Sequence, residues 1–246
     1  MEQSTVKKYE LLIDDTYEFF DVTVFRIKAL ISFGNIKKGE LGGYVEKEDN
    51  LCHSGNAWVY DDAKVRGNAR VYGNAEVSGD ALVFGNAKVY DNALVTDNAS
   101  VSDNAEVYGD ATVSGNAAVS GNALVYENAR VSGIANAAVF GNAAGVYENA
   151  KVYGNALVSR AEVYGDAQVY GNADVSLSAR VYGNAEVYGD AQVSLYAEVT
   201  GNAKVYGNAK VYGNAEVYGY TKVTGNAEVS DEEILGQPSP SFDQGL

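Results

Sequence analysis

Residues 204–220 read KVYGNAKVYGNAEVYGY and repeat nearly the same six residues three times. Valine favours extended backbone, and the residues on either side of it point to the opposite face of a strand. We therefore expect each valine to point inward, between two outward residues. The Gly-Asn pair predicts a corner because both residues tolerate left-handed backbone, and the alanine that follows fits a cramped inner position. A period of six predicts short strands joined by turns rather than a helix.

The same unit recurs throughout residues 51–230. Its valines are regularly spaced from Val59 to Val131 and from Val163 to Val229, and the spacing is irregular only in between, at Val139, Val146 and Val158. Taking every third unit gives a column of outward residues that is almost all tyrosine: Tyr72, Tyr90, Tyr108, Tyr126, Tyr147, Tyr164, Tyr182, Thr200 and Tyr218. Three units per coil are therefore favoured. The prediction is an all-β protein, a triangular parallel β-helix of about ten coils of 18 residues.

The unit V-x-G-N-A-x resembles the hexapeptide repeat of left-handed parallel β-helix proteins. Its Tyr-Gly-Asn-rich form follows LGGYVEKEDNLCHSGNAWVYDDA at residues 41–63, and in this it more closely resembles the YdcK-like β-solenoid proteins of bacteria and phages. The resemblance implies a left-handed coil. Acyltransferases of the hexapeptide class use a histidine as general base and bind coenzyme A between the subunits of a trimer, so the resemblance also implies that activity as an alternative.

Both ends depart from the repeat. Residues 1–50 predict a β-hairpin cap with strands in 7–15 and 19–33, a turn at Asp14–Thr16 and a glycine-rich loop over 34–45. Residues 231–246 predict a C-terminal cap with an acidic tail, in which Ile234 and Leu235 cover the last coil.

The chain of 246 residues has a net charge of −15, which argues against direct binding to nucleic acid. It has a single cysteine and no apolar run of signal-peptide or membrane-spanning length. These features predict a cytoplasmic protein that does not engage a membrane.

His53 is the one histidine and the weak candidate for a catalytic base, and its neighbour Cys52 is expected to be a small buried residue. One histidine is too few for the three-histidine zinc site known on this fold. The corners carry mostly neutral asparagine, whereas calcium prefers clustered carboxylates. Glycines recur without a following helix, so no nucleotide-binding fingerprint is present. The prediction is therefore no metal and no cofactor.

Two surface features are candidates for binding a partner. Between residues 91 and 129 the chain has acids and no bases, at Asp91, Asp97, Asp103, Glu106, Asp110 and Glu127. Asp91, Asp97 and Asp103 are expected on three different edges. Such a run is a solvated surface, or it imitates a phosphate backbone as acidic β-helical inhibitors of DNA-binding enzymes do. The tyrosine column, with Tyr72, Tyr90, Tyr108 and Tyr126, either stabilises the coil or forms an interface.

The sequence favours a rigid non-enzymatic β-solenoid that binds a protein partner through this acidic and Tyr-rich surface, including the case of a phage-borne inhibitor or DNA mimic. Specificity is expected where the repeat fails, near Ile134–Asn136, Gly145 and Ser159–Arg160. The alternatives are an acyltransferase, and a structural or self-assembling spacer. A homo-oligomer through one solenoid face is also compatible with the pattern.

Overall fold

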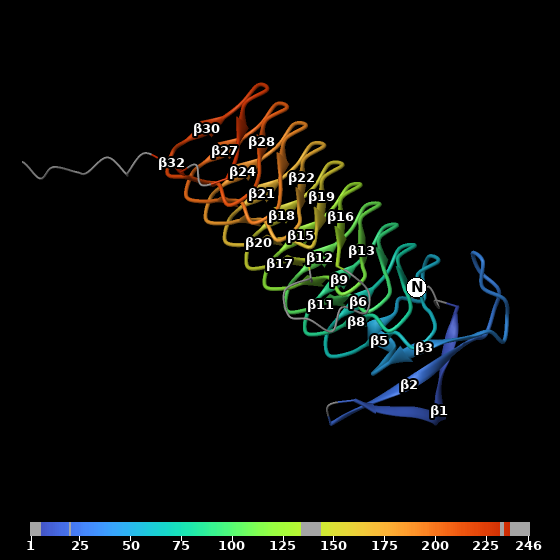
Figure 1. The fold of residues 1–246 in the computed structure, drawn as a ribbon. Coiled ribbons are helices and arrows are strands. Elements are labelled where there is room, and N and C mark those ends of the chain that lie inside the picture. The colour runs from blue at the N-terminus through green and yellow to red at the C-terminus, as the bar shows by residue number, and fades with distance from the viewer. Residues whose placement is uncertain (1–5, 20, 134–143, 232–233, 237–246) are drawn as a thin grey trace, which may run out of the picture.

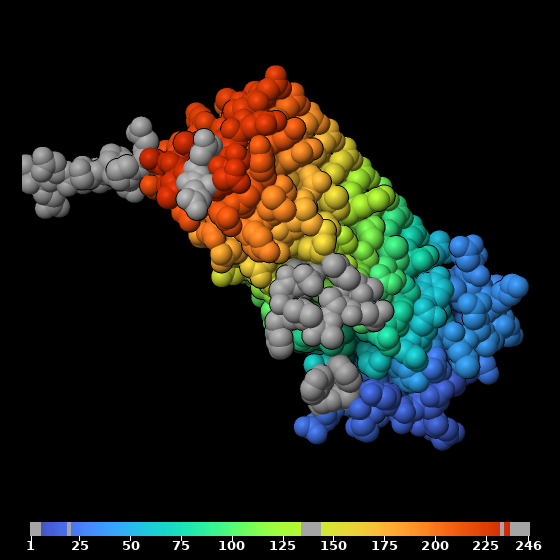
Figure 2. Space-filling view, viewed as in Figure 1, coloured from blue at the N-terminus to red at the C-terminus, as the bar shows by residue number. Residues whose placement is uncertain are grey.

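The computed structural model describes residues 6–19, 21–133, 144–231 and 234–236. The coils stack into a straight rod with an antiparallel hairpin at its N-terminal end (Figures 1 and 2). In the described residues, strands from successive coils pair in parallel, and together with the antiparallel strands of the N-terminal end they form three sheets of thirteen, ten and nine strands. Apart from one short 3-10 turn, η1 (Glu48–Asn50), the described regular elements are all strands. The predicted three-sided β-solenoid is confirmed.

We name the three sheets by what they carry. The cap sheet contains the hairpin, and its strands are β1 (Tyr9–Phe19), β2 (Val22–Ala29), β3 (Leu41–Val45), β5 (Lys64–Val65), β8 (Leu82–Val83), β11 (Ser100–Val101), β14 (Ala118–Val119), β17 (Gly145–Val146), β20 (Glu162–Val163), β23 (Arg180–Val181), β26 (Glu198–Val199), β29 (Glu216–Tyr218) and β32 (Ile234–Gly236).

The serine sheet is followed mainly by outward serines, and its strands are β4 (Trp58–Val59), β7 (Glu76–Val77), β10 (Leu94–Val95), β13 (Thr112–Ser114), β16 (Arg130–Ser132), β19 (Leu157–Ser159), β22 (Asp174–Ser176), β25 (Gln192–Val193), β28 (Lys210–Val211) and β31 (Glu228–Val229). The tyrosine sheet consists of β6 (Arg70–Val71), β9 (Lys88–Val89), β12 (Glu106–Val107), β15 (Leu124–Val125), β18 (Lys151–Val152), β21 (Gln168–Val169), β24 (Glu186–Val187), β27 (Lys204–Val205) and β30 (Lys222–Val223).

The core is a column of the repeat's valines and alanines. Val83, Val125 and Val187, for example, are fully buried, as are the corner alanines beside them. Among the described residues, the larger apolar side chains that are fully buried lie at the N-terminal end, for example Trp58 and Leu51. Each coil therefore packs against its two neighbours through small residues, as expected of a repeat protein whose stability adds up locally.

The corners explain the Gly-Asn pair. The corner glycines have φ near +70°, a conformation that a side chain disfavours. Successive corners also approach closely: a Cβ added at Gly115 would lie 2.1 Å from the carbonyl oxygen of Gly133. Glycine is thus favoured at these corners both for its backbone angles and for the stacking distance between coils.

The predicted column of tyrosines is wrong beyond Tyr126. Strand β15 pairs with β18, so Val125 lies beside Val152 and Tyr126 stacks on Tyr153 rather than on Tyr147. The reason is that β16 is followed directly by β17, and the unit counted at Val139 is not one of the described strands. Residues 134–143, which include Val139 and the predicted Ile134–Asn136, lie outside the described residues.

The hairpin also differs from prediction. Strand β1 continues through Asp14–Thr16, where its register with β2 shifts, and the chain reverses only near Asp21, which has φ of 58°. A bulge in β1 therefore stands where the turn was expected. Part of the expected glycine-rich loop is strand β3, which pairs with β2 on one side and with β5 on the other. This pairing joins the hairpin to the solenoid.

No helix in the described residues is long and apolar enough to cross a membrane.

Candidate functional sites on the solenoid surface

A continuous stack of tyrosines runs along the tyrosine sheet. Ring centroids are 4.8–5.0 Å apart and neighbouring planes differ by only 2–5°, through Tyr72, Tyr90, Tyr108, Tyr126, Tyr153, Tyr170, Tyr188 and Tyr206. Each inner ring has both faces against another ring, so a partner reaches ring edges and hydroxyl groups. Burial in this stack raises the pKa of Tyr126 to about 12. The four tyrosines predicted as partner candidates do lie together, and their stacking is itself stabilising.

The predicted acidic residues are not gathered on one surface. Asp91 follows the tyrosine sheet, Asp97 the serine sheet and Asp103 the cap sheet, which confirms their predicted placement on three edges. Each has a φ near 60° at the glycine position of its corner, and its carboxylate accepts the N–H of the glycine one coil further on: Gly109, Gly115 and Gly121 respectively. These three carboxylates therefore tie successive corners together.

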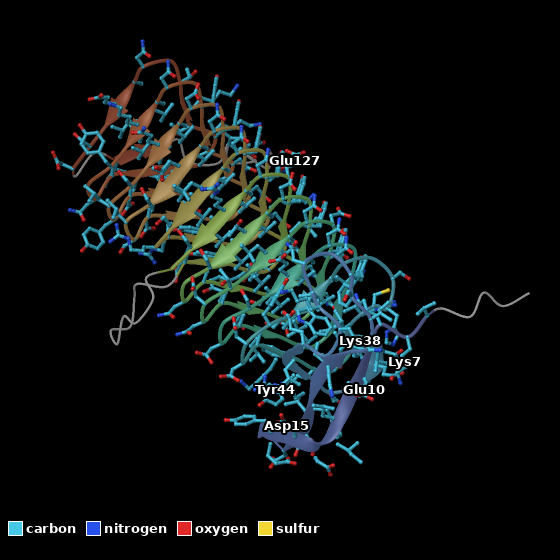
Figure 3. All side chains as sticks on the ribbon, turned by 90° about the vertical axis from the view of Figure 1, so that its right-hand side faces the viewer. Lys7, Glu10, Asp15, Lys38, Tyr44 and Glu127 are labelled. Carbon is cyan, nitrogen blue, oxygen red and sulfur yellow. The ribbon has the colours of Figure 1, made fainter. Side chains whose placement is uncertain are left out.

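The remaining three acids lie on or beside the tyrosine sheet. Glu127, labelled in Figure 3, accepts the N–H of Gly154, and Asp110 accepts the side-chain amide of Asn92. Glu106 pairs with the ammonium of Lys88 at 2.8 Å and accepts the hydroxyl of Tyr90, and these contacts lower its pKa. All six predicted acids thus have hydrogen-bond partners within the solenoid.

His53 belongs to the junction between hairpin and solenoid. Its ring stacks on Tyr9 at 4.4 Å, and its Nδ1 accepts the backbone N–H of Lys8 at 3.1 Å. A ring nitrogen that accepts a hydrogen bond is unprotonated, and burial lowers the pKa of His53. Cys52 is partly rather than fully buried, and its sulfur accepts the N–H of Ser54 at 3.4 Å. Both residues have structural partners at this junction.

We expect this junction to loosen below neutral pH. Since the pKa of His53 is lowered in the folded state, its contribution to stability is present above the usual value near 6.5 and is lost as the pH falls through the folded-state pKa. Protection of the Lys8 amide from hydrogen exchange should therefore be weaker at about pH 5.5 than at about pH 7. His53→Gln should abolish the difference, and equal protection of the unmodified protein at both pH values would contradict the interpretation.

The N-terminal segment before the first coil supplies hydrogen-bond donors to that coil, from Lys8 beside the hairpin and from Asn50 in η1, a role that the sequence analysis missed. In most coils the backbone N–H groups of the two residues that flank each inward valine donate to carbonyls of the next coil, so the first coil presents carbonyls such as that of Ala57 toward the N-terminal end. The buried ammonium of Lys8 donates to Ala57 at 2.9 Å and lies over the Phe33 ring, and its burial lowers its pKa to about 8. Asn50, fully buried, donates to the carbonyls of Gly67 and Ala69.

The corners from the serine sheet to the cap sheet contain the clearest departures from the repeat. In three successive coils the Gly-Asn pair is replaced, by Arg160 alone, by Leu177-Ser178 and by Leu195-Tyr196. We call these five residues the irregular edge. They line a small hollow of about 250 Å³, and the side chains of Leu195 and Tyr196 are 41% and 67% exposed.

All three replaced corners keep left-handed backbone without glycine. The φ angles are 53° at Arg160, 55° at Leu177 and 64° at Leu195. A bulky side chain in this region is strained by roughly 1–2 kcal/mol relative to glycine. The predicted break at Ser159–Arg160 is therefore part of this edge. Gly145, also predicted, lies in strand β17 beneath the ring of Tyr147.

A larger polar groove lies near the C-terminal end and is lined in part by residues of strands β21, β24, β27 and β30. These strands are labelled in Figure 1. Its volume is about 680 Å³, and it lies where the cap sheet turns into the tyrosine sheet. The described residues contain no group of three or more His, Cys, Asp or Glu side chains that could hold a metal ion.

The chain matches one family model, described as the YdcK β-solenoid repeat, over residues 87–103, 117–133 and 179–194. Each matched stretch contains three consecutive strands, one from each sheet, and so corresponds to one coil. No curated protein matches the chain. The matched repeats and the parallel three-sheet architecture agree with one another, and the chain is a YdcK-like β-solenoid repeat protein.

Proposed function

We propose that the protein is a rigid, non-enzymatic scaffold that binds a protein partner, and that the irregular edge is its main contact surface. The observation that carries this proposal is the replacement of Gly-Asn by exposed Leu195 and Tyr196 in an otherwise strict repeat. Leucine at φ of 64° does not serve the stability of the corner, since glycine adopts that angle without strain. Tyrosine and arginine are enriched among residues that dominate binding energies at interfaces.

The acidic and Tyr-rich surface stays a prediction as a second contact region. Its six carboxylates have intramolecular partners, and its inner tyrosine rings stack on one another, which gives both features a structural role without any partner. The DNA-mimic, acyltransferase and spacer alternatives likewise stay predictions, because no particular contact in the structure favours them over protein binding.

Restoring the repeat at the irregular edge tests the proposal. The double change Leu195→Gly with Tyr196→Asn should raise stability by about 1 kcal/mol by relieving the strained corner. It should weaken capture of a partner from a lysate of the source cell at least about tenfold, equivalent to roughly 1.4 kcal/mol. Quantitative mass spectrometry of the captured proteins, with thermal unfolding in parallel, measures both effects.

Tyr220→Asn is the matched control, because Tyr220 is similarly exposed, at 60%, and occupies the same corner position on another edge. This control should retain the partner. A partner that binds the restored corner as well as the original, or that is lost equally with Tyr220→Asn, would overturn the proposal.

A further inference from the structure

The groove near the C-terminal end contains a break in a ladder of side-chain amides. On the edge between the cap and tyrosine sheets, each amide donates to the next coil along Asn68, Asn86, Asn104, Asn122, Asn149 and Asp166. The ladder ends at Asp166 because a carboxylate has no N–H to donate. In the described part of the chain, the amides of Asn184 and Asn202, one and two coils further on, have no hydrogen-bond partner.

The unpaired amides face a groove of a size typical of small-ligand sites. The groove is about 680 Å³ in volume, within the usual range of roughly 300–1,000 Å³. Asp166, Asn184, Asn202 and Tyr220 line one side, at the same corner position in four successive coils. At the spacing of paired strands this side is about 14 Å long. The groove is therefore an elongated site that matches a short linear ligand.

The acidic and basic side chains that line the groove are equal in number. Its opposite side is formed by outward residues of the tyrosine sheet, including Glu186, Lys204 and Lys222. The ammonium of Lys204 lies 2.6 Å from one carboxylate oxygen of Glu186, and the hydroxyl of Tyr170 donates to the other at 3.0 Å. With Asp166 and Lys222 added, two acids face two lysines. A neutral ligand fits this balance better than a phosphate, which needs clustered bases.

Tyr220 interrupts the corner pattern at the end of the groove. It stands where the repeat has asparagine, and its ring is 60% exposed. An exposed aromatic ring offers an apolar surface with a polar tip, on which a ligand with both apolar and hydroxyl faces can pack. Free amides beside it offer donors and acceptors in one plane, which suits adjacent hydroxyl groups.

We propose that this groove binds a neutral oligosaccharide. The hydroxyl groups of the sugar pair with the amides of Asn184 and Asn202, and one sugar ring packs on Tyr220. This inference does not depend on the proposed protein partner, because the groove and the irregular edge lie on different edges of the solenoid and share no residues.

Saturation-transfer NMR with a panel of neutral trisaccharides of glucose, xylose and N-acetylglucosamine, with a trigalacturonate as the charged comparison, tests the proposal. We expect transfer from the full-length protein to at least one neutral sugar. Tyr220→Asn should weaken that binding at least about tenfold, and folding is preserved because asparagine is the usual residue at this corner position. Asn202→Ala should weaken it as well.

The restored corner Leu195→Gly with Tyr196→Asn is the control and should bind the same sugar unchanged. Loss of the protein partner in that control with retained sugar binding would separate the two proposals. The absence of transfer to every neutral sugar, stronger binding of trigalacturonate, or binding that is unaffected by Tyr220→Asn and Asn202→Ala would each overturn the assignment.

Discussion

Val125→Asp is expected to unfold the central coils of the solenoid. Val125 is fully buried and lies between Val107 and Val152 of the neighbouring coils. A carboxylate at this position has only valine and alanine around it, and an unpaired buried charge destabilises a protein by about 4–5 kcal/mol. For a chain of this length the midpoint of thermal unfolding should fall on the order of 10 °C.

Leu124→Asp is the matched control, because Leu124 is in the same strand but points outward. Leu124→Asp should lower the free energy of unfolding by about 1 kcal/mol or less. Hydrogen exchange identifies the coils that Val125→Asp destabilises. The backbone amides of β12, β15 and β18 should lose protection first, since each coil contacts only its neighbours. Equal destabilisation by both substitutions, or protection lost uniformly along the rod, would contradict this account of the core.

Most of the fold is readable from the repeated unit because three local rules agree within six residues. Valine alternates with outward neighbours, glycine supplies the left-handed corner, and alanine fits inside it, as the burial of Val83 and Ala87 illustrates. The number of units per coil followed from the tyrosines, since like residues stack when coils are in register. Each of these rules involves neighbouring residues or neighbouring units, so a single sequence was enough to predict the fold.

The register beyond Tyr126 was not readable. The unit at Val139 has the same six-residue pattern as a coil unit, and the strand pairs show that the described sheets continue from β14 to β17 and from β16 to β19 without it. A unit that adds a strand to these sheets and one that does not are alike in sequence. Hydrogen bonding between coils distinguishes them, and that information is not local.

The candidate sites also combine features that are present in the sequence with features that depend on contacts between coils. Departures from the unit at Leu177, Leu195 and Tyr220 mark the irregular edge and the polar groove, but the valine spacing is regular there, and the predicted breaks were only those near Ile134–Asn136, Gly145 and Ser159–Arg160. The broken amide ladder was not visible, because it depends on which asparagines lie above one another. Nor was the link between Lys8 and His53, which brings together residues from the hairpin and the first coil.

The short turn η1 before the first coil provides the last prediction, Asn50→Asp, which keeps the shape of a buried side chain and reverses its hydrogen bonding. The Asn50 amide donates to Gly67 at 3.1 Å and to Ala69 at 2.8 Å, and its oxygen accepts from Lys47. A carboxylate there would face two carbonyl oxygens without a proton. We expect a loss of about 3–5 kcal/mol at neutral pH, from two lost donors and a buried charge.

This loss should shrink as the pH falls, because burial against carbonyls raises the pKa of the new carboxyl and its protonated form can donate one of the two bonds. Asn104→Asp is the matched control: Asn104 is exposed in the amide ladder, where the chain already has Asp110 and Asp166 at equivalent corners. Asn104→Asp should lower the free energy of unfolding by less than about 1 kcal/mol. Urea denaturation at about pH 7 and about pH 5 measures both variants. If Asn50→Asp is no more harmful than Asn104→Asp, or is equally harmful at both pH values, Asn50 does not stabilise the first coil by donating to its carbonyls.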